Sequence, residues 1–399
     1  MVPTVTDDAA VPAAEPGTTG ATAAERAVRA FELVESWMFS EPMARLLAAF
    51  GGRLPTAGEP VGPLPDQELP DWLSPILDDG DQVVRGLTTA QTDLLRRALA
   101  VEQTASAEFD FRARGGGQYR ERSQAPAADF DDGLRSLVLA LADQLGLVSP
   151  QPTRFDRYAM TLVLGGGYRS PLLRSRYAAK LQAQGVSLGE LSFLGSPRFL
   201  IDEPAERPAA DEYAPGATDE FDLMSGAAQA EFGLAPTEVA FLCGCPRADR
   251  ICPAWRFADT EEAGQTPPSY THERQVDLVD RTGRVGGIVL SASTSRPPYR
   301  PDTADTFALW ARHYDPQPGQ RVLVVTTQVF VPFQSFEGIR RLYLVPGLEV
   351  DTVGFGSEWD DRPRTAEYLL QEVLSAIRSG CRLLIGAAEL LVTGTVTSD

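Results

Sequence analysis

Apolar residues in the first part of the chain recur at helical spacing. Phe31, Val34 and Trp37 are three positions apart, which is typical of a helix with one buried face. Two later segments repeat this pattern, residues 88–109 and 129–148, and loops rich in proline and glycine separate them. The pattern predicts a domain made of helices.

Beyond Pro152 the pattern changes to short, almost continuously apolar runs that alternate with helical segments. Such runs are typical of strands buried on both faces, and their alternation with helices indicates a parallel sheet covered on both sides. The expected strands lie within residues 157–168, 191–200, 286–293, 321–331 and 348–355. The expected helices lie within residues 170–185, 220–234, 302–314, 333–345 and 365–380.

These elements predict an α/β fold, with a doubly wound, mostly parallel Rossmann-like sheet and an N-terminal helical domain. We expect the helical domain over residues 23–150 and the sheet domain over residues 151–399, with an insertion at about residues 202–277. Ligands of such sheets bind in the crevice beyond the carboxyl ends of the strands. Polar residues at those ends are therefore the first candidates for a functional site.

The composition is that of a globular protein with a large acidic excess. The 399 residues carry a formal net charge of −19, which opposes nonspecific binding to nucleic acid or anionic lipid. No apolar run in the sequence approaches the roughly 20 residues that cross a bilayer. Residues 1–22 lack the basic and apolar regions of a signal peptide, so we expect a disordered lead-in and a cytoplasmic protein.

Residues 165–167 are three glycines between the first expected strand and an arginine-rich helix. They match neither the dinucleotide pattern G-x-G-x-x-G nor a P-loop. One interpretation is a tight turn that needs glycine for positive φ. The other is an anion site at the start of the helix, where Arg169, Arg174 and Arg176 add positive charge.

The segment PDTADT places acids and hydroxyls at the start of a later expected helix. Asp302 or Thr303 is the expected N-cap. The others, including Asp305 and Thr306, then face the crevice and hold ribose hydroxyls or an amine, or the two acids do acid–base chemistry.

Three polar residues follow the apolar run LVV of the fourth expected strand. They are Thr326, Thr327 and Gln328. Polar residues at the carboxyl end of a buried parallel strand indicate a site more often than a core. We expect them to orient the acceptor of a reaction.

Four segments between about Tyr158 and Gly356 together resemble the SanA/YdcF/ElyC-like family of Rossmann-like proteins. The first is LVLGGG with the helix RSRYAAKLQAQG, the second SFLGSP, the third PDTADT and the fourth RVLVVTTQVFVPFQSFEGIRRL. The residues that match the family's pattern are Gly166, Gly167, Arg176, Gly195, Ser196, Thr303, Asp305, Thr326 and Thr327, with Asp302 and Thr306 as looser matches.

The chain also departs from that family. Phe330 stands in the place of its histidine, and Phe333 or Gln334 in the place of its arginine. Some members act at the bacterial envelope, whereas this sequence lacks their membrane anchor. Because one member is reported to bind S-adenosylmethionine, the resemblance implies that compound or a nucleotide as the ligand.

Three cysteines within ten residues, Cys243, Cys245 and Cys252, are candidate zinc ligands, with His272 or Cys381 as a fourth. Their spacing fits no common zinc motif. The alternatives are buried apolar residues or a reactive thiol near arginine.

An arginine-rich segment around a second triple glycine is a candidate interaction arm. It contains Arg112, Arg114, Arg120 and Arg122. It is either a solvated loop or an arm that binds a phosphate-bearing partner such as tRNA.

The leading hypothesis is a cytoplasmic group-transfer enzyme of bacterial specialised metabolism, with an adenosyl-, nucleotide- or aminoacyl-tRNA-type donor. The alternative is a non-catalytic ligand sensor or scaffold, which Phe330 in place of the histidine favours. The candidate catalytic residues are Asp302, Asp305, Thr326 and Thr327. The candidate ligand-binding residues are Gly165, Gly166, Gly167, Arg169, Arg176, Gly195, Ser196, Thr303, Thr306 and Gln328.

Overall fold

The computed structural model describes residues 20–59, 86–111, 128–198, 200, 207–241, 272–295, 301–360 and 364–394. The chain divides into two compact units. The first unit contains residues 1–150, 328–347 and 356–398, and the second contains residues 151–327 and 348–355. Residues 328–347 and 356–398 are thus grouped with the helices of the first unit rather than with the sheet.

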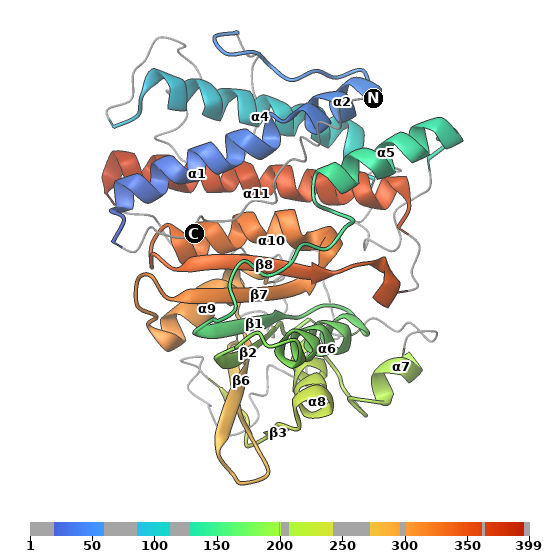
Figure 1. The fold of residues 1–399 in the computed structure, drawn as a ribbon, viewed down its shortest axis with the longest axis vertical. Coiled ribbons are helices and arrows are strands. Elements are labelled where there is room, and N and C mark those ends of the chain that lie inside the picture. Colours follow the sequence, from blue (N-terminus) through green and yellow to red (C-terminus); the bar gives the residue numbers. More distant parts are fainter. Residues whose placement is uncertain are drawn as a thin grey trace. The chain divides into compact units, whose positions relative to one another are not determined.

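The first unit is built around one long helix, α11 (Ala366–Thr393), which packs against α1 (Ala23–Met38), α4 (Thr89–Phe109), α5 (Asp132–Gln144) and α10 (Val331–Gly338). Figure 1 shows α1 and α11 side by side. The unit also holds α2 (Glu41–Ala49), the 3₁₀ turns Gln328–Phe330 and Ser357–Trp359, and a π-helical turn at Ile339–Tyr343. Thr22 and Thr88 open α1 and α4 with capping boxes.

A buried acid ties α10 to α11 inside this unit. Glu337 is 1% exposed and accepts hydrogen bonds from Ser379 Oγ at 2.7 Å, Arg340 Nε at 3.0 Å and Arg382 Nε at 3.1 Å. Burial by itself raises the pKa of Glu337, but the two guanidinium groups outweigh it and hold the pKa at about 2.

The second unit is the α/β part. Its sheet has the order β3-β5-β6-β2-β1-β7-β8, and β4 also pairs with β5. The strands are β1 (Met160–Leu164), β2 (Glu190–Gly195), β3 (Ala235–Pro236), β4 (Ala240–Phe241), β5 (Arg274–Val279), β6 (Val285–Ser291), β7 (Arg321–Thr327) and β8 (Glu349–Phe355). The helices are α6 (Ser170–Ala183), α7 (Arg207–Asp211), α8 (Glu220–Phe232) and α9 (Thr303–Tyr314).

Strands β6, β2, β1, β7 and β8 are parallel neighbours in that order (Figure 1). The chain therefore runs outward from β1 to β6 and returns to β7 on the other side of β1. That reversal makes the gap between β1 and β7 the topological switch point, where ligands of doubly wound sheets bind.

Helices cover both faces of this sheet. On β2, Phe193 packs against Phe232 of α8 with ring centroids 5.8 Å apart, whereas the preceding Ser192 accepts a hydrogen bond from Trp310 Nε1 of α9 at 3.0 Å. Successive residues of a strand point to opposite faces, so α8 and α9 lie on opposite sides. The predicted α/β fold, with a mostly parallel Rossmann-like sheet flanked by helices, is confirmed.

Several elements differ from the sequence prediction. Strands β3 and β4 lie within the expected insertion and β5 begins there, where no strand was expected. Strand β7 ends at Thr327, because the chain turns into 3₁₀ and helical structure there. Helix α11 continues through Gly380 to Thr393.

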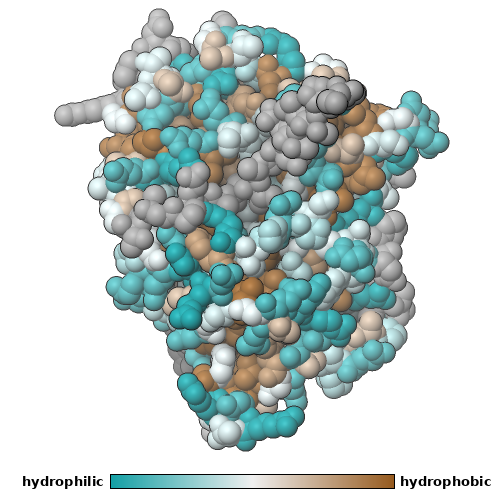
Figure 2. Space-filling model, viewed as in Figure 1, coloured by the Kyte–Doolittle hydropathy of each residue, from teal (hydrophilic) through white to brown (hydrophobic). Residues whose placement is uncertain are grey.

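Figure 2 shows hydrophilic residues over most of the described surface on the side drawn. Among the described residues, the exposed large hydrophobic ones lie on separate segments, and they are Val28, Leu139, Val285 and Val345. Among the described residues, we find no helix with the length and apolar character needed to cross a membrane.

Glu337→Gln should destabilise the protein in a pH-dependent way. The folded-state pKa of Glu337, about 2, lies below its ordinary value of 4.5. The carboxylate therefore contributes fully above pH 4.5, and its contribution of about 3 kcal/mol is lost as the pH falls from 4.5 towards 2. Urea unfolding at several pH values measures this, with the exposed Glu41→Gln as the control. A free-energy difference between wild type and Glu337→Gln that stays constant on acidification would contradict the assignment.

Candidate functional site

The carboxyl ends of the parallel strands meet at one edge of the sheet, here called the carboxyl edge. Parallel register pairs Leu164 with Leu194, Gly195 with Ser291, and Thr327 with Phe355. The segments that follow β1, β2 and β7 therefore leave the sheet next to one another. The structure thus brings together the glycine turn, the Gly195–Ser196 loop and Thr327.

The glycine turn is set by close backbone approach. Gly165 N donates to Leu194 O at 2.6 Å, and a methyl group at Gly165 would lie 2.7 Å from that oxygen. A methyl group at Gly166 would lie 2.9 Å from Ser170 Cβ, whereas Gly167 has open space. None of the three has positive φ, so the expectation of a positive-φ turn is wrong.

Arg174 is the arginine that reaches the switch point. It is 2% exposed, its Nη1 donates to Leu164 O at 3.1 Å and to Gly165 O, and its Nε lies 3.3 Å from Thr327 Oγ1. It therefore joins the carboxyl ends of β1 and β7. The guanidinium group is a fixed cation at the place where such sheets bind ligands.

The other two candidate arginines lie elsewhere on this segment. The side chain of Arg176 is 51% exposed and pairs with Glu231 of α8 at 2.9 Å. Arg169 is the half-buried residue that precedes α6. The structure therefore places Arg176, the arginine of the family resemblance, on the surface.

A second polar group lies between the ends of β1 and β2. Ser196 Oγ donates to Glu220 Oε2 at 2.7 Å, and Arg198 Nη1 donates to Glu220 Oε1 at 3.3 Å. A methyl group at Gly165 would lie 3.4 Å from Glu220 Oε2, so this carboxylate sits directly against the glycine turn. Glu220, 24 residues beyond Ser196, was missed because no spacing in the sequence connects them.

The residue before Glu220 belongs to a buried ion pair. Asp219 is fully buried, caps α8 by accepting a hydrogen bond from Asp222 N at 3.1 Å, and pairs with Arg274 of β5. Burial raises the pKa of Asp219 to about 7, and the charge of Arg274 opposes this shift.

The two expected catalytic acids form the capping box of α9. Asp302 is the N-cap, as one interpretation predicted, and Asp305 Oδ2 accepts from Asp302 N at 2.8 Å. Asp305 Oδ1 accepts from Ser295 N at 3.1 Å. Burial, followed by the charge of Asp302, raises the pKa of Asp305. Thr306 Oγ1 donates to Thr303 O at 2.9 Å. The hydrogen bonds of these acids are those of a helix start.

The three polar residues at the end of β7 divide between the two units: Thr326 and Thr327 end the strand, and Gln328 follows it. Thr327 contacts Arg174, as described above. Thr326 is fully buried in β7, and its hydroxyl makes no hydrogen bond within the described structure. Gln328 belongs to the first unit, where Nε2 donates to Gly146 O at 2.7 Å.

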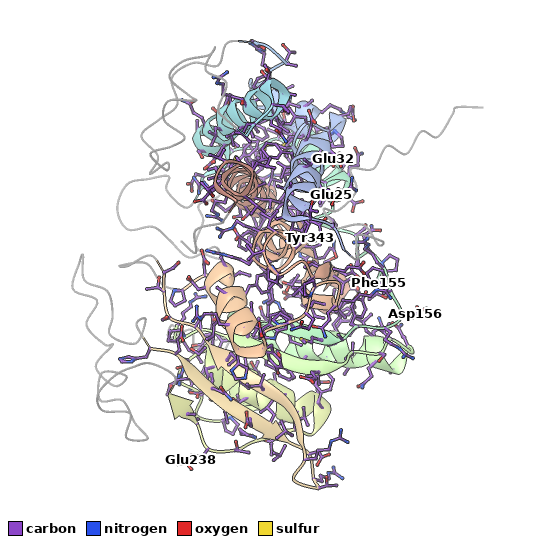
Figure 3. All side chains as sticks on the ribbon, turned by 90° about the vertical axis from the view of Figure 1, so that its left-hand side faces the viewer. Glu25, Glu32, Phe155, Asp156, Glu238 and Tyr343 are labelled. Carbon is purple, nitrogen blue, oxygen red and sulfur yellow. The ribbon has the colours of Figure 1, made fainter. Side chains whose placement is uncertain are left out.

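Cation–π contacts and a hydrogen bond to a buried acid lie at the amino edge of the sheet. Phe155, labelled with Asp156 in Figure 3, lies under the guanidinium groups of Arg154 and Arg321 at 5.3 and 4.1 Å. Tyr158 donates a hydrogen bond to Asp351 of β8. These contacts have structural roles, which leaves the carboxyl edge as the candidate site.

The candidate metal ligands and the arginine arm lie mainly outside the described residues. Cys243, Cys245 and Cys252 are outside them, and so are Arg112, Arg114, Arg120 and Arg122. His272 is buried, which lowers its pKa. Cys381 is buried in α11, donates to Ala98 O at 3.4 Å, and has a raised pKa because of its burial. Within the described ranges, no cluster of three or more potential metal ligands is found.

At the carboxyl edge a buried cation thus lies on one side of β1, and a buried carboxylate with a hydroxyl lies on the other. Arg174 suits an anionic group, because guanidinium binds phosphate or carboxylate through paired hydrogen bonds. Glu220 and Ser196 suit hydroxyl or amine groups.

The sequence is similar to curated mycobacterial proteins that are described as uncharacterized. Relatives from two strains of Mycobacterium tuberculosis and from Mycobacterium bovis are each 32% identical over 396 residues. The match covers 91% of this chain and 92% of each relative. No protein-family model and no solved structure matches the chain.

Gly165→Ala should destabilise the protein, whereas Gly167→Ala should not. The new methyl group at Gly165 would be 2.7 Å from a backbone oxygen, which must move, and at Gly167 it meets open space. We expect a cost of about 2 kcal/mol for Gly165→Ala. Thermal unfolding of the two variants measures the difference. Equal melting temperatures would show that the close approach of β1 and β2 is not a constraint.

Proposed function

We propose that this chain is a group-transfer enzyme that binds a nucleotide- or adenosyl-type donor. The chain belongs to the same family as the Mycobacterium tuberculosis protein Rv3785. The donor would bind at the carboxyl edge of the sheet in the second unit. The observation that carries this proposal is the buried guanidinium of Arg174 between the ends of β1 and β7.

The topology of the sheet supports an anionic group on the ligand. The switch point of a doubly wound sheet is where dinucleotides and related ligands bind. Here it holds a buried arginine, and α6 begins at Ser170 only a few residues after β1. A helix start favours negative charge, so α6 and Arg174 both favour a phosphate or a carboxylate.

Side chains on the other side of β1 support a nucleoside portion on the ligand. Glu220 and Ser196 lie against Gly165, the first residue after the strand. A carboxylate there would accept hydrogen bonds from a ribose or an amine. A hydroxyl there would donate to a ribose oxygen or accept from either group. A ligand that carries both an anionic group and hydroxyls matches both sides, and nucleotides and S-adenosylmethionine belong to this class.

The family resemblance of the four strand-end segments supports S-adenosylmethionine as one candidate donor. A charged tRNA is another form of the same proposal, with residues 112–122 as its contact. We propose that the enzyme acts in the cytoplasm, in bacterial specialised metabolism.

One observation favours a second candidate function, a ligand-binding sensor or scaffold without catalysis. Asp302 and Asp305, the expected acid–base pair, bind backbone amides of the α9 cap. Acids held in this way serve the fold, and the described carboxyl edge then has Glu220 as its nearest candidate base.

Arg174→Gln should weaken ligand binding, and Arg176→Gln should not. The two arginines lie on one helix, but Arg174 is buried at the switch point and Arg176 pairs with Glu231 on the surface. Loss of a charge-assisted contact predicts a roughly tenfold to hundredfold weaker affinity for Arg174→Gln. Calorimetric titration with ATP and S-adenosylmethionine measures it, with circular dichroism to check folding. Equal affinities of both variants would remove Arg174 from the site.

The enzyme and the sensor are separated by measuring binding and turnover together. Wild-type protein is incubated with S-adenosylmethionine, ATP and charged tRNA, while thermal shift and consumption of each donor are followed. The enzyme proposal predicts a thermal shift and consumption of the same donor when an acceptor pool is present. A shift without consumption of any donor contradicts the enzyme and supports the sensor.

A further inference from the structure

The start of α8 carries the acid that faces the proposed ligand site. Glu220 is the first residue of this helix, and its backbone N donates to Arg198 O at 3.1 Å. Its position therefore depends on how the first turn of α8 is held. Two observations show what holds it.

Arg274 contacts the residues on both sides of Glu220. It forms an ion pair with Asp219, and its guanidinium lies over the ring of Phe221 at 4.2 Å. Asp219 is fully buried and Arg274 is 5% exposed. Both contacts are strengthened in such a place, because little water competes with them.

The second observation is the close approach of β2 to the same turn. A methyl group at Gly195 would lie 3.1 Å from Phe221 Cα and 3.2 Å from Phe221 N. The end of β2 thus touches the backbone next to Glu220, while Arg274 holds the turn from β5. The end of β2 and the Asp219–Arg274 ion pair therefore both restrict the position of the first turn of α8.

We propose that Arg274 is a positioning residue, which fixes Glu220 in the ligand site by holding Asp219 and Phe221. This inference rests on the proposed ligand site at the carboxyl edge. It gives strand β5, which is antiparallel to β6, a part in ligand binding. The expected insertion, at about residues 202–277, then contributes residues to the ligand site.

The test compares two ion pairs made by the same helix. Asp219 at the start of α8 pairs with Arg274 and is buried, whereas Glu231 near its end pairs with the exposed Arg176. Arg274→Gln is the test variant and Arg176→Gln its matched control. Arg274→Lys keeps the charge and is the conservative variant.

Two quantities are measured on the full chain. Hydrogen–deuterium exchange of the Glu220 and Asp222 amides reports how firmly the first turn is held, without any ligand. Calorimetric titration with ATP and with S-adenosylmethionine reports binding. If Arg274→Gln does not fold because Asp219 loses its buried partner, the double variant Asp219→Asn/Arg274→Gln replaces both members of the ion pair and is used instead.

The proposal predicts that Arg274→Gln exchanges both amides about tenfold faster and binds the ligand about tenfold more weakly. Arg274→Lys should recover most of the affinity, and Arg176→Gln should match wild type in both measurements.

Unchanged exchange in Arg274→Gln would overturn the proposal, and so would faster exchange with unchanged affinity. Faster exchange in a protein whose wild type binds neither probe would support the positioning of Glu220 and contradict the proposed function. The two proposals therefore fail separately.

Discussion

The contact between Gly165 and Leu194 is the constraint on which the carboxyl edge depends. The backbone N of Gly165 bonds Leu194 O at 2.6 Å, in a space that excludes even a methyl group. This contact brings the exit of β1 against the exit of β2, where Glu220 lies beside the glycine turn. On the other side, Arg174 binds the carbonyl groups of Leu164 and Gly165 and reaches β7. The cation and the carboxylate of the site thus share one backbone turn.

The sequence predicted the parallel strands well because most of them contain an apolar run, whereas β8 also holds the buried polar residues Glu349, Asp351 and Thr352. It missed β5, in which buried and half-buried residues alternate within a segment poor in other strand signals. It also ended the last helix at Gly380, since glycine is common beyond a helix end. The structure shows another reason for that glycine: a methyl group there would lie 3.0 Å from Met38 Cε, so tertiary packing keeps the residue small.

At the carboxyl edge, where the sequence predicted a site, the structure brings forward other side chains than those that were predicted. Arg174 and Arg176 are two positions apart, so they point about 200° apart around the helix, and the sequence does not show which one faces the sheet. Glu220 depends on Arg274, which follows Asp219 by 55 residues. Such long-range partners leave no local pattern. The acids of PDTADT, in contrast, carried a local cap signal, which the structure confirms for Asp302.

The mycobacterial relatives are similar over most of this chain, so the function of the carboxyl edge can be tested in them as well. The most direct test of the account is a crystal structure of this protein grown with ATP or S-adenosylmethionine. The account predicts that the phosphate or carboxylate lies within hydrogen-bond distance of Arg174 and the turn at residues 165–170, with hydroxyl groups towards Glu220. A ligand bound at the amino edge, near Phe155 and Arg321, would contradict it.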